Sequence, residues 1–119
     1  MADVFGLKTI NGLFNIENLD IIANSGNYHS PSEIFSGKVF HTFLDKLTLR
    51  YDYIFFEAPA MNKYSDAKEL TDYAEKVVTI FSADSDLKPS DEESLDFIKG
   101  MGNKFMGAVL NKIDLKNLN

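Results

Sequence analysis

The stretch YDYIFFEAPA, residues 51–60, is the part of the chain that best indicates its fold. Its centre, YIFF at residues 53–56, is an unbroken run of aromatic and β-branched side chains with strong strand preference. A short apolar run without alternation is typical of a parallel strand that is covered on both faces. The run ends at Glu57, and in open α/β sheets ligands bind just outside the carboxyl ends of the strands. We therefore predict a central strand at residues 53–56 and take Glu57 as the first candidate functional residue.

Glu57 has a second explanation that the sequence leaves open. Glu57 is a candidate because it lies at the end of a predicted strand, and not because it belongs to a reaction motif. It is equally well explained as the point at which the strand reaches solvent.

The composition indicates one soluble domain. A chain of 119 residues with 45% apolar content is enough for a single core. The net charge of −6 argues against nucleic acid or an acidic membrane surface as the main partner, because both would be repelled. Cysteine is absent, which excludes disulfides and cysteine metal sites. No window approaches the roughly 18 apolar residues of a membrane span, and we expect a cytoplasmic location.

Helix and strand signals alternate on both sides of residues 53–56. Upstream, residues 1–13 are predicted to form a loop with one helical turn, and LDIIA at residues 19–23 is predicted to form a short strand. Ser30 and Glu33 have the spacing of a capping box, which predicts the start of a helix of about 18 residues. Its apolar residues recur at helical spacing and predict one apolar stripe: Phe35, Phe40, Phe43, Leu44 and Leu47.

Downstream, the same alternation continues. The predicted elements are a helix at residues 66–75, a strand at 76–81, a helix from a second capping box at Ser90 and Glu93 to about Met101, and a strand at 105–110. Strands that alternate with helices favour right-handed crossovers and a parallel sheet. We therefore predict an α/β fold for residues 1–119, with a three-layer parallel sheet of about four strands and helices on both faces.

Motifs that would identify a catalytic site directly are absent from the sequence. The Walker A pattern G-x-x-x-x-G-K-[ST], which cradles nucleotide phosphates, does not occur. Four acids lie at or beyond predicted strand ends: Glu57, Asp66, Asp84 and Asp86. Because Mg²⁺ takes one or two carboxylates plus water, they suggest a magnesium site, although acids on loops are commonly just solvated.

Five segments, taken in order, resemble a known family. They are IENLDIIANSG, SPSEIF, YDYIFFEAPA, SDAKELTDYAEKVVTIFSA and MGAVLNKIDL. Their succession resembles the C-terminal two-thirds of the bacterial tyrosine kinases of capsule and exopolysaccharide synthesis, which are P-loop ATPases related to the MinD and ParA group. The resemblance implies a partial P-loop NTPase-like fold that lacks the Walker A segment.

The resemblance also implies roles for particular residues. Glu57 matches the Walker B aspartate that contacts Mg²⁺ in the family, with a side chain one methylene longer. Asp66 matches the segment that opens the next helix and is a weaker metal candidate. Asn111 matches an asparagine near the adenine in related ATPases. ATP and Mg²⁺ are the cofactors of the family, whereas no cofactor is expected for this chain alone.

Departures from the family pattern limit the activity that is expected. The Walker A loop is missing, the Walker B segment is altered, and no tyrosine cluster follows Asp114. We therefore expect a portion of a tyrosine-kinase or ATPase domain of capsular or exopolysaccharide biosynthesis that is not catalytic by itself. Expected partners are a membrane-bound polysaccharide copolymerase or sister kinase domains, with homo-oligomers as a further form and no nucleic acid. The parent protein is expected in the cytoplasm or as part of an inner-membrane protein.

Two other functions fit parts of the sequence. One is a non-catalytic interaction or regulatory module of a polysaccharide-export system. The other is a receiver-like signalling domain, which is suggested by FSAD at residues 81–84 after a strand. The missing N-terminal acidic pair argues against the receiver-like domain.

Overall fold

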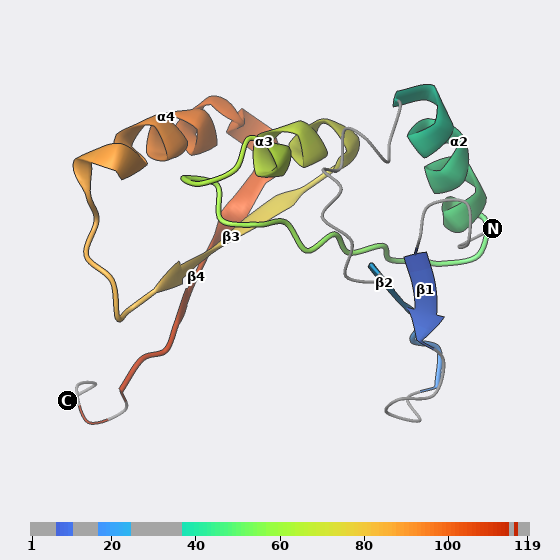
Figure 1. The fold of residues 1–119 in the computed structure, drawn as a ribbon, viewed down its shortest axis with the longest axis horizontal. Helices are drawn as coiled ribbons and strands as arrows, with labels where there is room; N and C mark the ends of the chain where they lie inside the picture. The colour runs from blue at the N-terminus through green and yellow to red at the C-terminus, as the bar shows by residue number, and fades with distance from the viewer. Residues whose placement is uncertain (1–6, 11–16, 25–36, 115, 117–119) are drawn as a thin grey trace. The chain divides into compact units, whose positions relative to one another are not determined.

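The computed structural model describes residues 7–10, 17–24, 37–114 and 116. The chain divides into two compact units, Met1–Lys46 and Leu47–Asn119, and each is described by itself (Figure 1). The prediction of one domain over residues 1–119 stays a prediction.

The first unit contains an antiparallel pair of strands. Strand β1 (Leu7–Ile10) pairs with β2 (Ile21–Asn24), so that Leu7 lies opposite Asn24 and Ile10 lies opposite Ile21. The strand predicted at residues 19–23 is thus present with shifted ends, but the loop predicted over residues 1–13 is wrong at β1. The apolar and β-branched residues of β1 form a strand because β2 offers partners for their backbone amides and carbonyls.

Helix α2 (Gly37–Thr48) carries the apolar stripe that the sequence predicts. Phe40 is buried, with 1% of its surface exposed, and its ring stacks on that of Phe43 with 6.4 Å between centroids. These residues and Leu47 follow the i, i+3, i+7 spacing of one helix face. The capping box predicted at Ser30 and Glu33 lies outside the described residues.

The second unit is built on a parallel strand pair. Strand β3 (Val77–Ser82) pairs with β4 (Phe105–Asn111), which confirms the strands predicted at residues 76–81 and 105–110. The register is irregular between Val77 and Val78, where β4 carries an additional residue before Gly107. The φ of Gly107 is 142°, a backbone conformation that favours glycine.

Two helices lie on the same side of this strand pair (Figure 1). They are α3 (Asp66–Leu70), which continues as the 3₁₀ turn η2 (Thr71–Tyr73), and α4 (Glu92–Gly100), which follows the turn η3 (Pro89–Asp91). A third turn, η4 (Gly102–Lys104), leads from α4 into β4. The helices bury small and polar side chains, namely Ala67, Thr71 and Ser94.

The start of α4 differs from the prediction. The backbone N–H of Lys88 donates to the carboxylate of Asp91 at 2.8 Å, so that Asp91 takes the capping role expected of Glu93. Glu93 instead forms an ion pair with Lys68 of α3. The predicted capping box at Ser90 and Glu93 is therefore wrong, because the turn η3 moves the start of the helical path toward Lys88.

The central strand predicted at residues 53–56 is not formed. These residues belong to no helix or strand, and Tyr53 and Phe55 are 81% and 91% exposed. An apolar run becomes a strand only where another strand pairs with it, and the ladders of the described residues, β1 with β2 and β3 with β4, do not include residues 53–56. The structure is thus α/β with a two-stranded parallel sheet, and the four-stranded three-layer sheet is not seen in the described ranges.

No helix in the described part of the chain combines the length and the apolar character that a bilayer span requires.

The burial of Phe40 yields a stability prediction. Replacing it by Ala (Phe40→Ala) should lower the free energy of unfolding by about 3 to 5 kcal/mol, because the lost ring leaves a cavity. Chemical denaturation measures this loss. Leu49→Ala is the control, since Leu49 is 87% exposed and its removal should cost less than about 0.5 kcal/mol. Equal losses in the two variants would contradict the assignment of Phe40 to a core.

Candidate functional site

The carboxyl ends of β3 and β4 form the edge at which α/β folds bind ligands. Ser82 lies opposite Asn111 in the parallel register. The backbone N–H of Ala83 donates to the carbonyl of Asn111 at 2.9 Å, which extends the ladder by one bond. The pairing of the two strands therefore fixes the backbone position of Asn111, the predicted adenine-side residue.

The side chain of Asn111 is exposed and turned back on its own backbone. Its Oδ1 accepts from the backbone N–H of Lys112 at 2.8 Å. Lys112 has a φ of 58°, in the left-handed region that lets the chain turn sharply after the strand. In this conformation the amide nitrogen Nδ2 of Asn111 is the group that can donate to a ligand.

The loop after β3 is organised by its own polar residues. The hydroxyl of Ser85 donates to the carbonyl of Ser82 at 3.2 Å, and the N–H of Asp84 donates to the hydroxyl of Ser82 at 3.4 Å. Lys112 Nζ lies 3.6 Å from Asp84 Oδ2, which joins this loop to the end of β4. Asp84 thus has a lysine partner at the same sheet edge, which sequence reasoning missed.

The two predicted metal ligands lie on separate segments. Glu57 is exposed and follows residues 53–56, whereas Asp66 is the first residue of α3 and is partly exposed. Throughout the described ranges, no group of three or more His, Cys, Asp or Glu side chains is placed to hold a metal. The structure therefore does not assemble an all-protein metal cage from these acids, and the role of each as a magnesium ligand stays a prediction.

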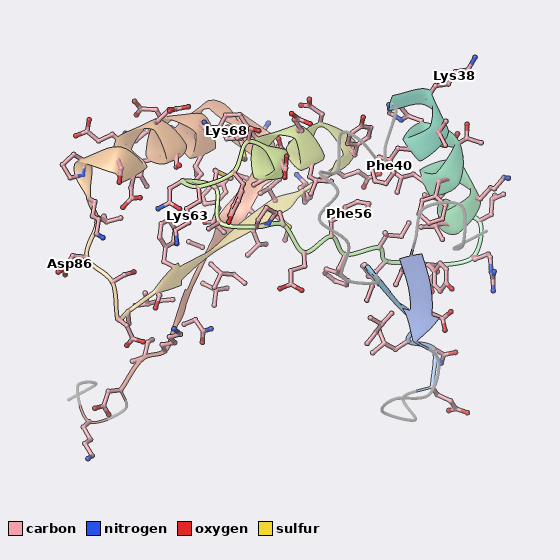
Figure 2. The ribbon with its side chains drawn as sticks, viewed as in Figure 1. Lys38, Phe40, Phe56, Lys63, Lys68 and Asp86 are labelled. Atoms are coloured by element: carbon pink, nitrogen blue, oxygen red, sulfur yellow. The ribbon has the colours of Figure 1, made fainter. Side chains whose placement is uncertain are left out.

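Lys68 joins α3 to α4 and was also missed by sequence reasoning. Figure 2 labels the Lys68 side chain on α3. Its ammonium group pairs with Glu93 and lies 5.5 Å from the centre of the Phe97 ring. The ion pair lowers the pKa of Glu93 below its ordinary value of 4.5. The sequence contains one signal for this site: Glu93 and Phe97 are four residues apart, and residues at that spacing lie on the same face of a helix.

A second contact joins the loop before α3 to the start of α4. The side-chain amide of Asn62 donates to Asp91 Oδ1 at 2.7 Å. The backbone hydrogen bond from Lys88 is the larger cause, and the bond from Asn62 the second, of a pKa of Asp91 below its ordinary value of 3.8. The loop that leads from Glu57 to α3 is thereby tied to the helical layer.

Lysine side chains close the other end of this unit. Lys104 Nζ donates to the carbonyl of Thr71 at 2.8 Å, and Lys76 Nζ donates to the carbonyl of Asn103, also at 2.8 Å. These bonds reach carbonyl groups at the start of η2 and in η4. They lie at the amino ends of β3 and β4, at the opposite end of the strands from the candidate site.

Comparison with curated proteins identifies relatives of the chain. CapB of Staphylococcus aureus, provisionally named a tyrosine-protein kinase, is 27% identical over 100 residues, which are 84% of this chain and 44% of CapB. The tyrosine-protein kinase CpsD of Streptococcus pneumoniae serotype 4 is 26% identical over 101 residues, which are 85% of this chain and 44% of CpsD. The chain is similar to bacterial tyrosine-protein kinases. The family resemblance seen in the sequence is thereby confirmed.

These kinases are longer than the chain. A CpsD from Streptococcus pneumoniae is 23% identical over 101 residues, again 85% of this chain and 44% of that kinase. The chain thus spans less than half the length of the curated relatives that it matches. No family model matches the chain, and no solved structure matches it.

The exposure of Glu57 yields a second prediction. Glu57→Ala should leave the melting temperature almost unchanged, because the carboxylate is solvated and its removal costs within about 0.5 kcal/mol. Differential scanning calorimetry checks this. A loss as large as that of a buried, paired acid would mean that Glu57 is structural and not a solvated ligand position.

The lowered pKa values of Asp91 and Glu93 yield a third prediction. A group with a depressed pKa in the folded state stabilises the fold above its unfolded pKa, and this contribution is lost as the pH falls through the folded value. Stability should therefore fall below about pH 4.5, the ordinary value for Glu93, and continue to fall below pH 3.8, the ordinary value for Asp91. Urea denaturation at a series of pH values measures this slope.

Two variants separate the contributions. Lys68→Met removes the ammonium group, and with it both the ion pair to Glu93 and the contact with the Phe97 ring, so it should flatten the slope below pH 4.5. Lys99→Met is the control, because Lys99 pairs with Asp96 within the same exposed helix turn and that pair contributes little. An unchanged slope in Lys68→Met would contradict the assignment of the pKa shift to this ion pair.

Proposed function

We propose that the chain is a portion of a bacterial tyrosine-kinase domain that acts in capsular or exopolysaccharide biosynthesis. The observation that carries the proposal is the similarity to tyrosine-protein kinases of two species over 84 to 85% of the chain. The parallel β3–β4 pair with α3 and α4 on one side supports an α/β domain of the P-loop type. In the proposed complete domain this pair belongs to a larger three-layer sheet, in which residues 53–56 form a further strand.

The candidate residues have limited roles in this domain. Glu57 occupies the Walker B position and supplies one carboxylate to a Mg²⁺ ion whose other ligands are nucleotide phosphates and water. When bound, the ion neutralises the charge that develops on the transferred phosphoryl group. The exposure of Glu57 and the lack of a three-acid group among the described residues fit this single-ligand role better than a dedicated metal cage. Asp66 is a weaker second ligand, and Asn111 meets the adenine through its amide.

The chain by itself is proposed not to transfer phosphate. Phosphoryl transfer depends almost entirely on positioning and electrostatic stabilisation by groups that cradle the phosphates. The Walker A loop that supplies these groups does not occur in the 119 residues. ATP and Mg²⁺ therefore require a segment outside this sequence that carries the phosphate-binding loop.

An interaction role follows from the surface of the second unit. Large apolar side chains are exposed there, among them Ile80 at 71% and Met106 at 67%. Such side chains on a sheet favour a docked protein partner. The proposed partners are sister kinase domains or a membrane-bound polysaccharide copolymerase. The chain would bind them in the cytoplasm at the inner membrane.

Nucleotide binding and cell phenotype together test this function. Isothermal titration calorimetry of the chain with ATP and Mg²⁺ should give no dissociation constant below the millimolar range, because a single carboxylate and one amide do not hold the phosphates. Deletion of the gene should lower the amount of capsular or exopolysaccharide on the cell. A micromolar dissociation constant would contradict the first statement, and an unchanged polysaccharide level would contradict the second.

A further inference from the structure

The carboxylate of Asp91 joins two loops of the second unit. One loop follows Glu57 and leads to α3, and the other follows β3 and leads to η3. Asp91 Oδ1 accepts a hydrogen bond from the side-chain amide of Asn62 at 2.7 Å, and Asp91 Oδ2 accepts from the backbone N–H of Lys88 at 2.8 Å. Each oxygen of one carboxylate thus holds a different loop. We call this set of contacts the Asp91 bridge.

Asn62 lies in a closed turn that leads back to Glu57. The backbone N–H groups of the two residues after Asn62 both donate to the carbonyl of Ala60, at 3.1 and 3.2 Å. Ala60 follows Pro59, whose ring fixes its own φ and also restricts the residue before it. The connection from Asn62 to Glu57 is therefore stiff, and a position that is imposed on Asn62 is passed on to Glu57.

Burial does little to fix the loop after Glu57. Residues 57–60 are all exposed, so apolar packing contributes little to their position. A hydrogen bond to an ionised carboxylate is stronger than one between neutral groups. The bond from the Lys88 amide, and second the bond from Asn62, lower the pKa of Asp91 below its ordinary value of 3.8, so that the carboxylate is ionised at neutral pH. The Asp91 bridge thus supplies a restraint that the exposed loop does not obtain from packing.

We propose that Asp91 is a positioning residue, which sets the place of the Glu57 carboxylate by holding Asn62. This inference rests on the proposed function, in which Glu57 supplies a carboxylate to Mg²⁺. Metal ligands depend on supporting contacts for their orientation, and ligands carried on loops are held less precisely than those on helices and strands. In this role Asp91 acts on the ion only through the loop and is not itself a ligand.

A cap at the start of η3 is the alternative role for Asp91. The bond from the Lys88 amide to Oδ2 is a capping interaction and needs no second loop. It leaves the bond from Asn62 to Oδ1 without a purpose. If Asp91 were only a cap, a change at Asn62 would not matter. The bridge requires both residues, and this difference separates the two roles.

Two single variants and their combination test the bridge in the full chain. Asp91→Asn keeps an oxygen for the Lys88 amide but turns a donor toward Asn62, and Asn62→Asp sets two carboxylates against each other. The double variant Asn62→Asp with Asp91→Asn restores the hydrogen bond with donor and acceptor reversed, and it keeps the net charge of −6. Asp72→Asn is the matched control, because Asp72 is exposed in η2 and loses the same charge.

Amide hydrogen exchange measures how firmly the loop is held. The reporters are the amides of Lys63 and Tyr64, which close the turn on the Ala60 carbonyl. Their protection factors should fall at least about threefold in each single variant, as expected for the loss of one hydrogen bond, and should return to within about twofold of the wild type in the double variant. Protection in β3 serves as the internal reference and should stay unchanged, as should the turn in Asp72→Asn.

Polysaccharide production measures the consequence for function. Each variant gene is returned to a strain in which the gene has been deleted, and capsular or exopolysaccharide is measured. We expect Glu57→Ala and both single variants to produce less polysaccharide than the wild type. The double variant and Asp72→Asn should restore the wild-type amount. Circular dichroism of each purified variant verifies that the fold is intact.

Three results would overturn the positioning role of Asp91. They are unchanged protection of the turn in both single variants, a loss of protection that the double variant does not recover, and full polysaccharide production by both single variants where Glu57→Ala lowers it. The proposed function is judged separately by deletion of the gene. An unchanged polysaccharide level after deletion would reject that function and with it the role of Glu57, whereas the protection factors would still decide whether Asp91 holds the loop.

Discussion

The parallel ladder between β3 and β4 is the interaction on which the second unit depends. It sets Ser82 beside Asn111 and so defines a sheet edge of the kind at which α/β folds bind ligands. A parallel pair needs a crossover connection, and here α4 supplies it. The same geometry demands a cover on both faces, and α3 and α4 provide it on one side. The exposure of Ile80 on the other side is therefore a consequence of the ladder and not a chance surface feature.

The helices α3 and α4 are held together by polar contacts more than by a large apolar core. Lys68 bridges to Glu93, and Asn62 and the Lys88 amide converge on Asp91. Such exposed contacts contribute little stability each, but they orient the loop that follows Glu57. The buried side chains of these helices, Ala67 and Ser94, are small, which lets the helices approach their neighbours closely.

The family relationship and the geometry concern different parts of the function. Similarity over most of the chain connects it to tyrosine-protein kinases, while each of the compared kinases extends well beyond the matched region. Glu57 and Asn111 lie on separate segments, and the groups that would bring a nucleotide to both are not in this sequence. A nucleotide site that uses both residues therefore has to be completed by the rest of a kinase domain.

The sequence by itself determined the alternation of elements, the strands at β3 and β4, and the apolar stripe of α2. These features depend on secondary-structure propensity and on the spacing of apolar side chains. Both are set by residues that are close together in the sequence. Tertiary structure decided what residues 53–56 become, because a strand requires partners that propensity cannot supply. It also decided that the capping interaction forms between Asp91 and Lys88 at the start of η3 and does not involve Glu93, which pairs with Lys68, 25 positions earlier in the chain. A local sequence pattern does not indicate contacts between residues that are far apart in the chain, so only the folded structure could reveal them.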